Sequence, residues 1–175
     1  VFKLDDEPCF YVYRLTMNGR QQTGLVGCCH FEEYYSGKIK KHELTRTAKE
    51  DDRVRHVDSL NANAEPVFFS YREHDSLEMV ITEVISADPE FNFIADDGIQ
   101  HELWVIGEES LNDRIESLFQ EVPDLYVADG HHRTAAAARI GKKRKENNPS
   151  HTGDEAYNFF MAVLFSDNQL KIYDY

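Results

Sequence analysis

The segment 125–133 constrains the fold of this chain more than any other stretch. It runs Leu-Tyr-Val-Ala-Asp-Gly-His-His-Arg and leads, after Thr134, into a run of alanines. An apolar run that ends in an acid and a glycine, before a series of helix formers, predicts a strand, a tight turn and a helix. The first N–H groups of a helix lack partners and carry the positive end of the helix dipole, so such a turn attracts anions. The segment therefore predicts a phosphate-binding corner, with a nucleotide as the expected ligand.

The side chains of this corner suit a phosphate. Gly130 lets the backbone come close to a ligand, and Arg133 can hold a phosphate through two parallel hydrogen bonds. Asp129 can orient His131 or hold a Mg²⁺ ion that bridges phosphates. The predicted phosphate-binding residues are Asp129, Gly130, His131, His132, Arg133 and Thr134. The alternative is a plain turn, in which Asp129 caps the helix and the histidines are surface donors.

Composition narrows the class of protein. The 175 residues suffice for a single domain, 1–175, with its own core. The net charge of −13 disfavours a broad nucleic-acid or membrane surface, but not a small local anion site. Three cysteines without metal-ligand spacing, and no apolar run of membrane length, favour a reducing cytoplasm and no membrane partner. The oligomeric state is left open.

Hydrophobic periodicity along the chain predicts an α+β fold. Alternating strands are expected at 9–15 and 23–31, with a turn at Asn18-Gly19 between them. The other expected strands are 67–69, 125–129 and the hairpins 91–95/100–106 and 158–165/170–173. Helices are expected at 42–60, at 77–85, at 111–122 and from the corner to about residue 147.

A second candidate site lies in the segment 39–53. If the segment is helical, spacings of three and four place four positions on one face: His42, Thr45 or Arg46, Lys49 and Arg53. Glu43 beside these cations could accept the proton of a substrate hydroxyl. A solvated charged helix would show a similar pattern, although the apolar stripe is weak. His42-Glu43 is not a zinc-protease motif, because Arg46 stands where the second histidine should be.

The basic run Lys-Lys-Arg-Lys at 142–145 has two interpretations. In the last turns of a helix, cations complement the negative end of the dipole. A nucleic-acid patch is the alternative, and the acidic net charge disfavours it.

The string Tyr-Val-Ala-Asp-Gly-His-His-Arg-Thr-Ala-Ala at 126–136 closely resembles the hallmark of domain of unknown function family 1015, a family of bacteria and archaea. Other stretches resemble the same family in the same order: 39–53, 66–71, 98–106 and 157–173. Members of this family are usually much longer. The resemblance therefore implies that the chain is an internal fragment of a longer family protein.

The Asp-Gly-His-His-Arg string is also similar to that of the ParB/sulfiredoxin-like superfamily, whose nearest functional relatives are free-serine kinases that use ADP or ATP. This resemblance implies a ParB/sulfiredoxin-like mixed sheet with helices, carrying inserted hairpins and helices at about 61–122. In those kinases the motif holds the nucleotide phosphates, and a glutamate in an upstream His-Glu pair activates the hydroxyl. By that likeness residues 129–133 would bind phosphate and Mg²⁺, and Glu43 would be the base with His42 beside it.

Three departures from the superfamily are informative. Sulfiredoxins need a cysteine nucleophile where this chain has His131, which argues against thiol repair. ParB proteins bind DNA through a separate helical domain, and the sequence suggests none here. About eighty residues separate Glu43 from the corner, a larger gap than in the kinases.

Three hypotheses follow. The first is a phosphotransferase that uses ATP or ADP, with Mg²⁺, on a small hydroxyl metabolite; Glu43 and His42 would be catalytic, with Thr45, Lys49 and Arg53 in support. The second is a regulatory module that binds a nucleotide or phosphorylated metabolite without turnover. The third, disfavoured by charge, is a nucleic-acid-associated protein. The expected partner is a small molecule or nucleotide.

Overall fold

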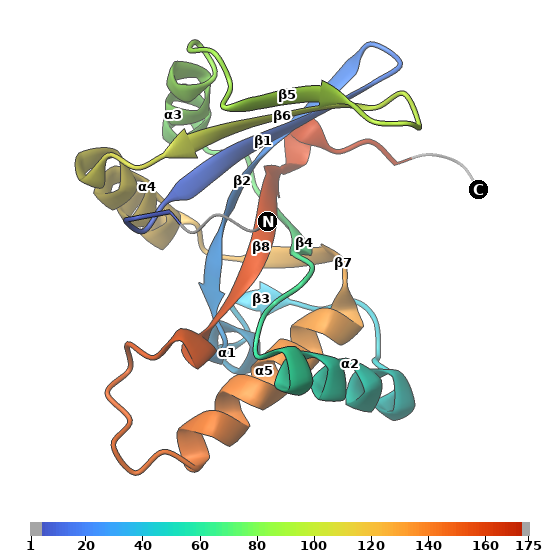
Figure 1. The fold of residues 1–175 in the computed structure, drawn as a ribbon, viewed down its shortest axis with the longest axis vertical. Coiled ribbons are helices and arrows are strands. Elements are labelled where there is room, and N and C mark those ends of the chain that lie inside the picture. Colours follow the sequence, from blue (N-terminus) through green and yellow to red (C-terminus); the bar gives the residue numbers. More distant parts are fainter. Residues whose placement is uncertain (1–4, 173–175) are drawn as a thin grey trace. The chain divides into compact units, whose positions relative to one another are not determined.

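The structure, a computed structural model, describes residues 5–172 and is α+β, as predicted. The elements in chain order are β1 (Phe10–Met17), β2 (Arg20–His30), α1 (Glu32–Ser36), β3 (Ile39–Lys40), α2 (Thr47–Leu60), β4 (Val67–Tyr71), α3 (Asp75–Val84), β5 (Phe91–Ile94), β6 (Gln100–Ile106), α4 (Glu109–Glu121), β7 (Leu125–Asp129), α5 (His131–Glu146) and β8 (Phe159–Ser166), with 3-10 turns at Ala156–Asn158 and Asp167–Gln169 (Figure 1). Parallel and antiparallel pairs both occur in the sheet. The specific ParB-like arrangement stays a prediction.

The chain folds into two compact units, each built from separate segments. The first unit contains the residues up to Gly27, Tyr71–Pro123 and the residues from Leu164 onward, and the second contains Cys28–Ser70 and Asp124–Val163. Every candidate site residue lies in the second unit. The predicted single domain, the insertion at 61–122 and the fragment hypothesis stay predictions.

The first unit is organised by the hairpin of β1 and β2. Its turn residues Asn18 and Gly19 both have positive φ, at 51° and 78°, which suits the tight hairpin predicted there. In the ladder, Val12 pairs with Leu25 on one side and with Trp104 on the other. These three side chains form the core with residues of α3, α4 and β6: Val80, Ile81, Ile106 and Ile115. The alternation predicted for 9–15 and 23–31 is thus confirmed.

The second unit is organised by β7 and α5. Its strands follow the order β3-β7-β4-β8, and β3 runs parallel to β7. Four consecutive alanines of α5, at positions 135–138, are buried. A Cβ at Gly141 would lie 2.7 Å from the ring of Phe31, so glycine permits this close approach.

Helix α2 is shorter than predicted. It begins at Thr47, and residues 41–46 are not helical, so the expectation that His42, Thr45, Lys49 and Arg53 share one helical face is wrong. The chain at Arg46 is extended, with ψ at 123°, and the Arg46 N–H donates to His132 Nε2 at 3.1 Å. This contact to α5 holds the segment out of the helix. Only Lys49 and Arg53 remain one helical turn apart.

Ion pairs connect α2 to α5, and no residue of α2 is fully buried, although Val54 and Val57 are half-buried. Arg139 pairs with Glu50 at 2.8 Å and with Asp51 at 2.9 Å, and Asp58 accepts from Lys143 and Arg144. The other two cations of the run 142–145 also have partners, Lys142 with Glu146 and Lys145 with Glu32. The basic run is therefore occupied by contacts within the protein, which weakens the nucleic-acid hypothesis.

The last predicted hairpin is only half present. Strand β8 ends at Ser166, and residues 170–172 are not a strand, while Tyr173 lies outside the described residues. Side-chain contacts replace strand pairing after β8: Arg20 donates to the Gln169 carbonyl at 2.6 Å, and Gln169 Oε1 accepts from the Thr23 N–H. The apolar alternation at 170–173 was therefore misleading.

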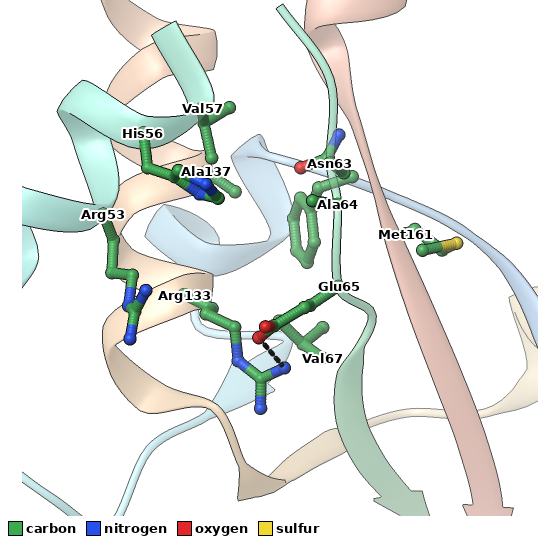
Figure 2. A pocket seen from close by; sticks show the side chains of 11 residues that line it. Arg53, His56, Val57, Asn63, Ala64, Glu65, Val67, Arg133, Ala137 and Met161 are labelled. Carbon is green, nitrogen blue, oxygen red and sulfur yellow. Dashed lines mark hydrogen bonds and ion pairs between the residues drawn. The ribbon is translucent and has the colours of Figure 1, made fainter. Parts of the chain in front are cut away.

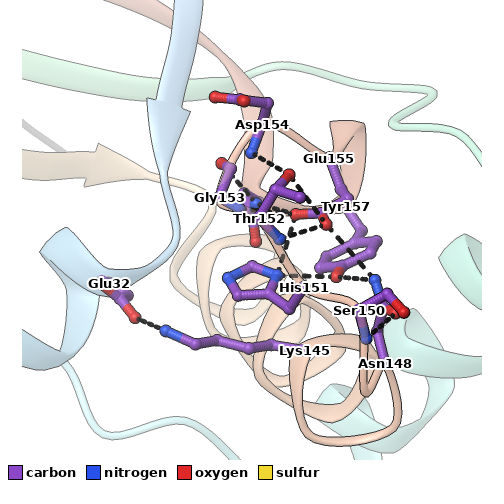
Figure 3. Close-up of polar contacts among 11 residues, drawn as sticks. Glu32, Lys145, Asn148, Ser150, His151, Thr152, Gly153, Asp154, Glu155 and Tyr157 are labelled. Carbon is purple, nitrogen blue, oxygen red and sulfur yellow. Dashed lines mark hydrogen bonds and ion pairs between the residues drawn. The ribbon is translucent and has the colours of Figure 1, made fainter.

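The loop between α5 and β8 is organised around the Glu155 carboxylate (Figure 3). It accepts hydrogen bonds from the N–H groups of Thr152 and Gly153, at 2.7 and 3.0 Å, and from the Asn158 amide at 3.2 Å. His151 Nδ1 lies 2.9 Å from the same carboxylate. These hydrogen bonds, led by that from Thr152, lower the pKa of Glu155 to about 2.

This pKa predicts an acid-sensitive loop. Because the folded pKa of Glu155 is depressed from 4.5 to about 2, its contribution to stability is complete above pH 4.5 and is lost as the pH falls toward 2. We expect Glu155→Gln to be less stable than the wild type at pH 6, and the difference to shrink toward pH 3. Urea unfolding of both proteins at each pH measures this. A difference that stays constant with pH would contradict it.

Candidate functional site

The predicted strand, turn and helix of segment 125–133 are confirmed. Strand β7 ends at Asp129, Gly130 adopts the left-handed conformation at φ 89° and ψ 31°, and α5 begins at His131. No side chain caps α5; Asp129 instead accepts a hydrogen bond from Arg133 Nη2 at 2.8 Å. The capping role considered for Asp129 is thus wrong. The N–H groups of the first helical turn are left to point at whatever occupies the corner.

Arg133 is held in place by its own chain. Nη1 donates to Glu65 Oε2 at 3.0 Å, a contact drawn in Figure 2, and to the Pro66 carbonyl at 2.9 Å. The segment that leads into β4 therefore fixes the guanidinium. A Cβ on Gly130 would lie 3.2 Å from Arg133 Nε and 3.3 Å from Nη2, which places this edge of the guanidinium against the turn. Within residues 5–172 the Nε–H has no acceptor and can serve a ligand.

Glu43 and His131 meet at the start of α5. Glu43 Oε2 lies 3.5 Å from His131 Nδ1; the glutamate side chain is 59% exposed and the histidine side chain 6% exposed. The His42 ring packs edge-on against the His131 ring at a centroid distance of 4.4 Å. Burial, and secondarily His42, lower the pKa of His131, although Glu43 and Asp129 oppose this. The lowered pKa means that His131 favours the neutral form.

His131 also has an unsatisfied nitrogen. Its Nε2 is buried and has no hydrogen-bond partner anywhere in residues 5–172. If the Nδ1 nitrogen carries the proton, toward the carboxylate, Nε2 is an acceptor without a donor. A buried polar atom of this kind is costly and is common at functional sites.

The parallel pairing of β3 and β7 explains why Glu43 reaches the corner. Ile39 pairs with Leu125 and Lys40 with Tyr126. Because the two strands are parallel, both chains leave the sheet at the same edge. Glu43 follows the end of β3 by three residues, and α5 begins directly after β7, so the two candidate segments meet there.

These segments line one open pocket of about 470 Å³. The lining residues are Glu43, Ala48, Lys49, Asp52, Arg53, Asp129, Gly130, His131, His132 and Arg133. Most of the predicted site residues are thus brought together. Asp52 was missed by the sequence analysis, although it stands three residues after Lys49 and its helical spacing could have indicated it.

Three predicted site residues lie elsewhere. Thr134 is fully buried, and its hydroxyl donates to the Gly130 carbonyl at 2.9 Å, so it stabilises the turn. The Thr45 hydroxyl donates to Glu50 at 2.7 Å. His42 contacts His131 but does not line the pocket.

A magnesium ion could bind here only with help from a ligand. Within residues 5–172 no group of three or more His, Cys, Asp or Glu side chains could hold a metal. Asp129 offers one exposed carboxylate, already shared with Arg133. Mg²⁺ usually binds through one or two carboxylates together with waters and substrate phosphates. Asp129 fits that arrangement if phosphates supply the remaining oxygens.

Substitution of Gly130 tests whether the turn requires a glycine in the left-handed conformation. We expect Gly130→Ala to lower the free energy of unfolding by about 1–2 kcal/mol, because an alanine is strained at φ 89°. The added Cβ should also move Arg133, which shifts the NMR resonance of its Nε–H. Gly37→Ala is the matched control, since φ is 83° there with nothing within 4 Å. An unchanged Arg133 resonance in Gly130→Ala would contradict the proposed contact.

The pKa of His131 tests its surroundings. We expect Glu43→Gln to lower the pKa of His131 further, because the removed charge stabilises the imidazolium, and His42→Gln to raise it. An NMR titration of the imidazole nitrogens measures both shifts. Asp52→Asn serves as the control within the same pocket. A rise in the His131 pKa on loss of Glu43 would show that the carboxylate does not face this ring.

Comparison with known proteins places the chain in one family. The family model described as "Protein of unknown function (DUF1015)" matches residues 1–175. No curated protein and no solved structure matches the chain. Among residues 5–172, no helix has the length and apolar character needed to cross a membrane.

Proposed function

The chain belongs to the DUF1015 family of proteins of unknown function, and we propose that it binds nucleotide phosphates at the start of α5 and transfers a phosphoryl group to a small hydroxyl compound. One observation carries the proposal. Glu43 and the uncapped start of α5, which are far apart in the sequence, open onto the same pocket. A general base and an anion-binding corner in one pocket are the two parts that phosphoryl transfer to a hydroxyl needs.

The α5 corner is the donor-phosphate subsite of this proposal. The first-turn N–H groups and the helix dipole attract a phosphate. The free Nε–H of Arg133 adds a charge-assisted hydrogen bond, and the contacts of Arg133 to Glu65 and Pro66 keep it in position. ATP or ADP is the proposed donor. Asp129 would hold Mg²⁺, which supplies charge neutralisation on the phosphates.

Glu43 is the proposed base. Its carboxylate is 59% exposed and therefore accessible to a substrate hydroxyl. The hydroxyl oxygen bonds to the terminal phosphorus as the bond from phosphorus to the bridging oxygen breaks. The hydroxyl proton passes to Glu43, and the shortened nucleotide leaves with the bridging oxygen. His131, which favours its neutral form, orients Glu43 without neutralising it.

A regulatory module that binds phosphate without turnover is the second candidate. It is favoured by the openness of the site, because the Glu43 and Asp129 side chains are 59% and 72% exposed. Efficient phosphoryl transfer requires that water be excluded from the reacting phosphate. This candidate predicts saturable nucleotide binding without product.

Calorimetry and ³¹P NMR with ADP, ATP and pyrophosphate, each with Mg²⁺, separate these functions. We expect Arg133→Lys to weaken binding about tenfold, because lysine cannot reproduce the fixed guanidinium edge. Glu43→Gln should bind the nucleotide like the wild type. It should lose phosphoryl transfer to a panel of small hydroxyl compounds by about a hundredfold or more.

Glu146→Gln is the control carboxylate, since Glu146 is exposed and, within residues 5–172, forms an ion pair only with Lys142. Near-ultraviolet circular dichroism checks that Arg133→Lys remains folded. Absence of pyrophosphate and nucleotide binding to the wild type would overturn the phosphate site. Turnover that survives in Glu43→Gln would overturn the base, and binding without any product would favour the regulatory module.

A further inference from the structure

Helix α2 carries two cations that have no partner. Within residues 5–172 neither Lys49 nor Arg53 forms an ion pair, a side-chain hydrogen bond or a ring contact, yet both line the pocket. The other charges of α2 differ in this respect. Glu50, Asp51 and Asp58 pair with α5, and Arg55 pairs with Asp52 on α2 itself.

Lys49 and Arg53 are exposed side chains that carry like charges one turn apart on α2. Like charges four residues apart on a helix repel one another. The chain holds 32 acidic residues against 19 Lys and Arg, so acidic partners are abundant in it. A bound anion would relieve this repulsion and supply the missing partner.

This cation pair is separate from the phosphate corner. Arg133 hydrogen-bonds to Asp129, Glu65 and Pro66, whereas within residues 5–172 neither Lys49 nor Arg53 forms a hydrogen bond or ion pair with any of them. Arg53 also lines the adjoining hollow, and Figure 2 shows it at the same end of that hollow as Arg133, but coming from α2 instead of α5. The pocket therefore offers two sets of cationic groups on two different helices.

The order of the elements in the chain favours Lys49 and Arg53 as contacts of the acceptor substrate. Glu43 lies in the segment that leads into α2, so the proposed base and the two cations belong to one stretch of chain, while the donor-phosphate groups belong to α5. An acceptor whose hydroxyl reaches Glu43 lies in the pocket that Lys49 and Arg53 also line. The remainder of that acceptor then meets Lys49 and Arg53.

We infer that Lys49 and Arg53 bind an anionic group of the acceptor, so that the acceptor is a hydroxyl compound bearing a carboxylate or a phosphate and not a neutral alcohol or sugar. The inference rests on the proposed function, since it concerns the second substrate of the same site. A carboxylate or phosphate matches an ammonium and a guanidinium through charge-assisted hydrogen bonds.

Three small probes that share a hydroxymethyl group test this. Glycolate carries a carboxylate, 2-hydroxyethyl phosphate carries a phosphate, and ethylene glycol carries neither. Each is titrated by NMR into the full chain with the phosphate corner saturated by pyrophosphate. The amide resonances of residues 47–53 are followed. We expect one or both anionic probes to bind and ethylene glycol not to bind.

Variants assign the binding to the two cations. The double variant Lys49→Gln/Arg53→Gln should weaken the anionic probe about tenfold or more, with less than about a twofold change in pyrophosphate affinity. Arg55→Gln, which removes a paired cation from the same helix and lies outside the pocket lining, is the matched control and should change neither. All three substituted side chains are exposed. Thermal unfolding verifies that both variants fold.

Several outcomes would overturn the inference: equal binding of the anionic probe to the double variant, equal binding of ethylene glycol, or no binding of either anionic probe. An equal loss of pyrophosphate affinity in the double variant would also overturn it, because the cations would then serve the donor phosphates. If pyrophosphate does not bind the wild type at all, the proposed function fails. The three probes, titrated without pyrophosphate, then still report on Lys49 and Arg53 separately.

Discussion

The parallel pairing of β3 with β7 is the contact on which the site depends. Strand β3 is only two residues long, and the Leu125 N–H donates to the Lys38 carbonyl at 2.9 Å just before the paired residues. This short ladder makes two distant stretches of chain leave the sheet at the same edge. Without this pairing, nothing would hold Glu43 close to His131, and the pocket would lack one of its walls.

The second constraint is the left-handed turn at Gly130. A residue with a side chain is disfavoured at φ 89°, and the same glycine leaves room for the Arg133 guanidinium above it. The turn thus serves two purposes at once. It starts α5 with unpaired N–H groups. It also leaves space beside them for the guanidinium of Arg133, which Glu65 and Pro66 hold in place.

The remaining wall of the pocket is α2, whose apolar side chains Val54 and Val57 are only half-buried. Helix α2 buries no residue and is joined to α5 through Arg139, Lys143 and Arg144. Exposed ion pairs contribute little to stability individually, and salt screens them. The wall that carries Lys49 and Arg53 is therefore the part of the site whose position is most sensitive to ionic strength. The acids of α2 that pair with α5 are structural charges. Lys49 and Arg53, which have no partner within residues 5–172, are the charges that a ligand can use.

Local patterns in the sequence determined the strand, turn and helix at 125–146 and the hairpin of β1 and β2, because apolar period, glycine and helix formers agree there within a few residues. They also indicated Glu43, Lys49, Arg53 and residues 129–133 as candidates. Local pattern failed at 42–46 and 170–172. The backbone there or next to it contacts long-range partners instead: His132 for Arg46, and Arg20 for Gln169. Only the tertiary structure decided that Glu43 and His131 lie 3.5 Å apart and that Thr134 is buried. It also decided that the cations of 142–145 are paired, whereas Lys49 and Arg53 have no partner among the described residues. The physical reason is that strand pairing and ion pairing join residues far apart in the chain, and no local pattern specifies which partners will meet.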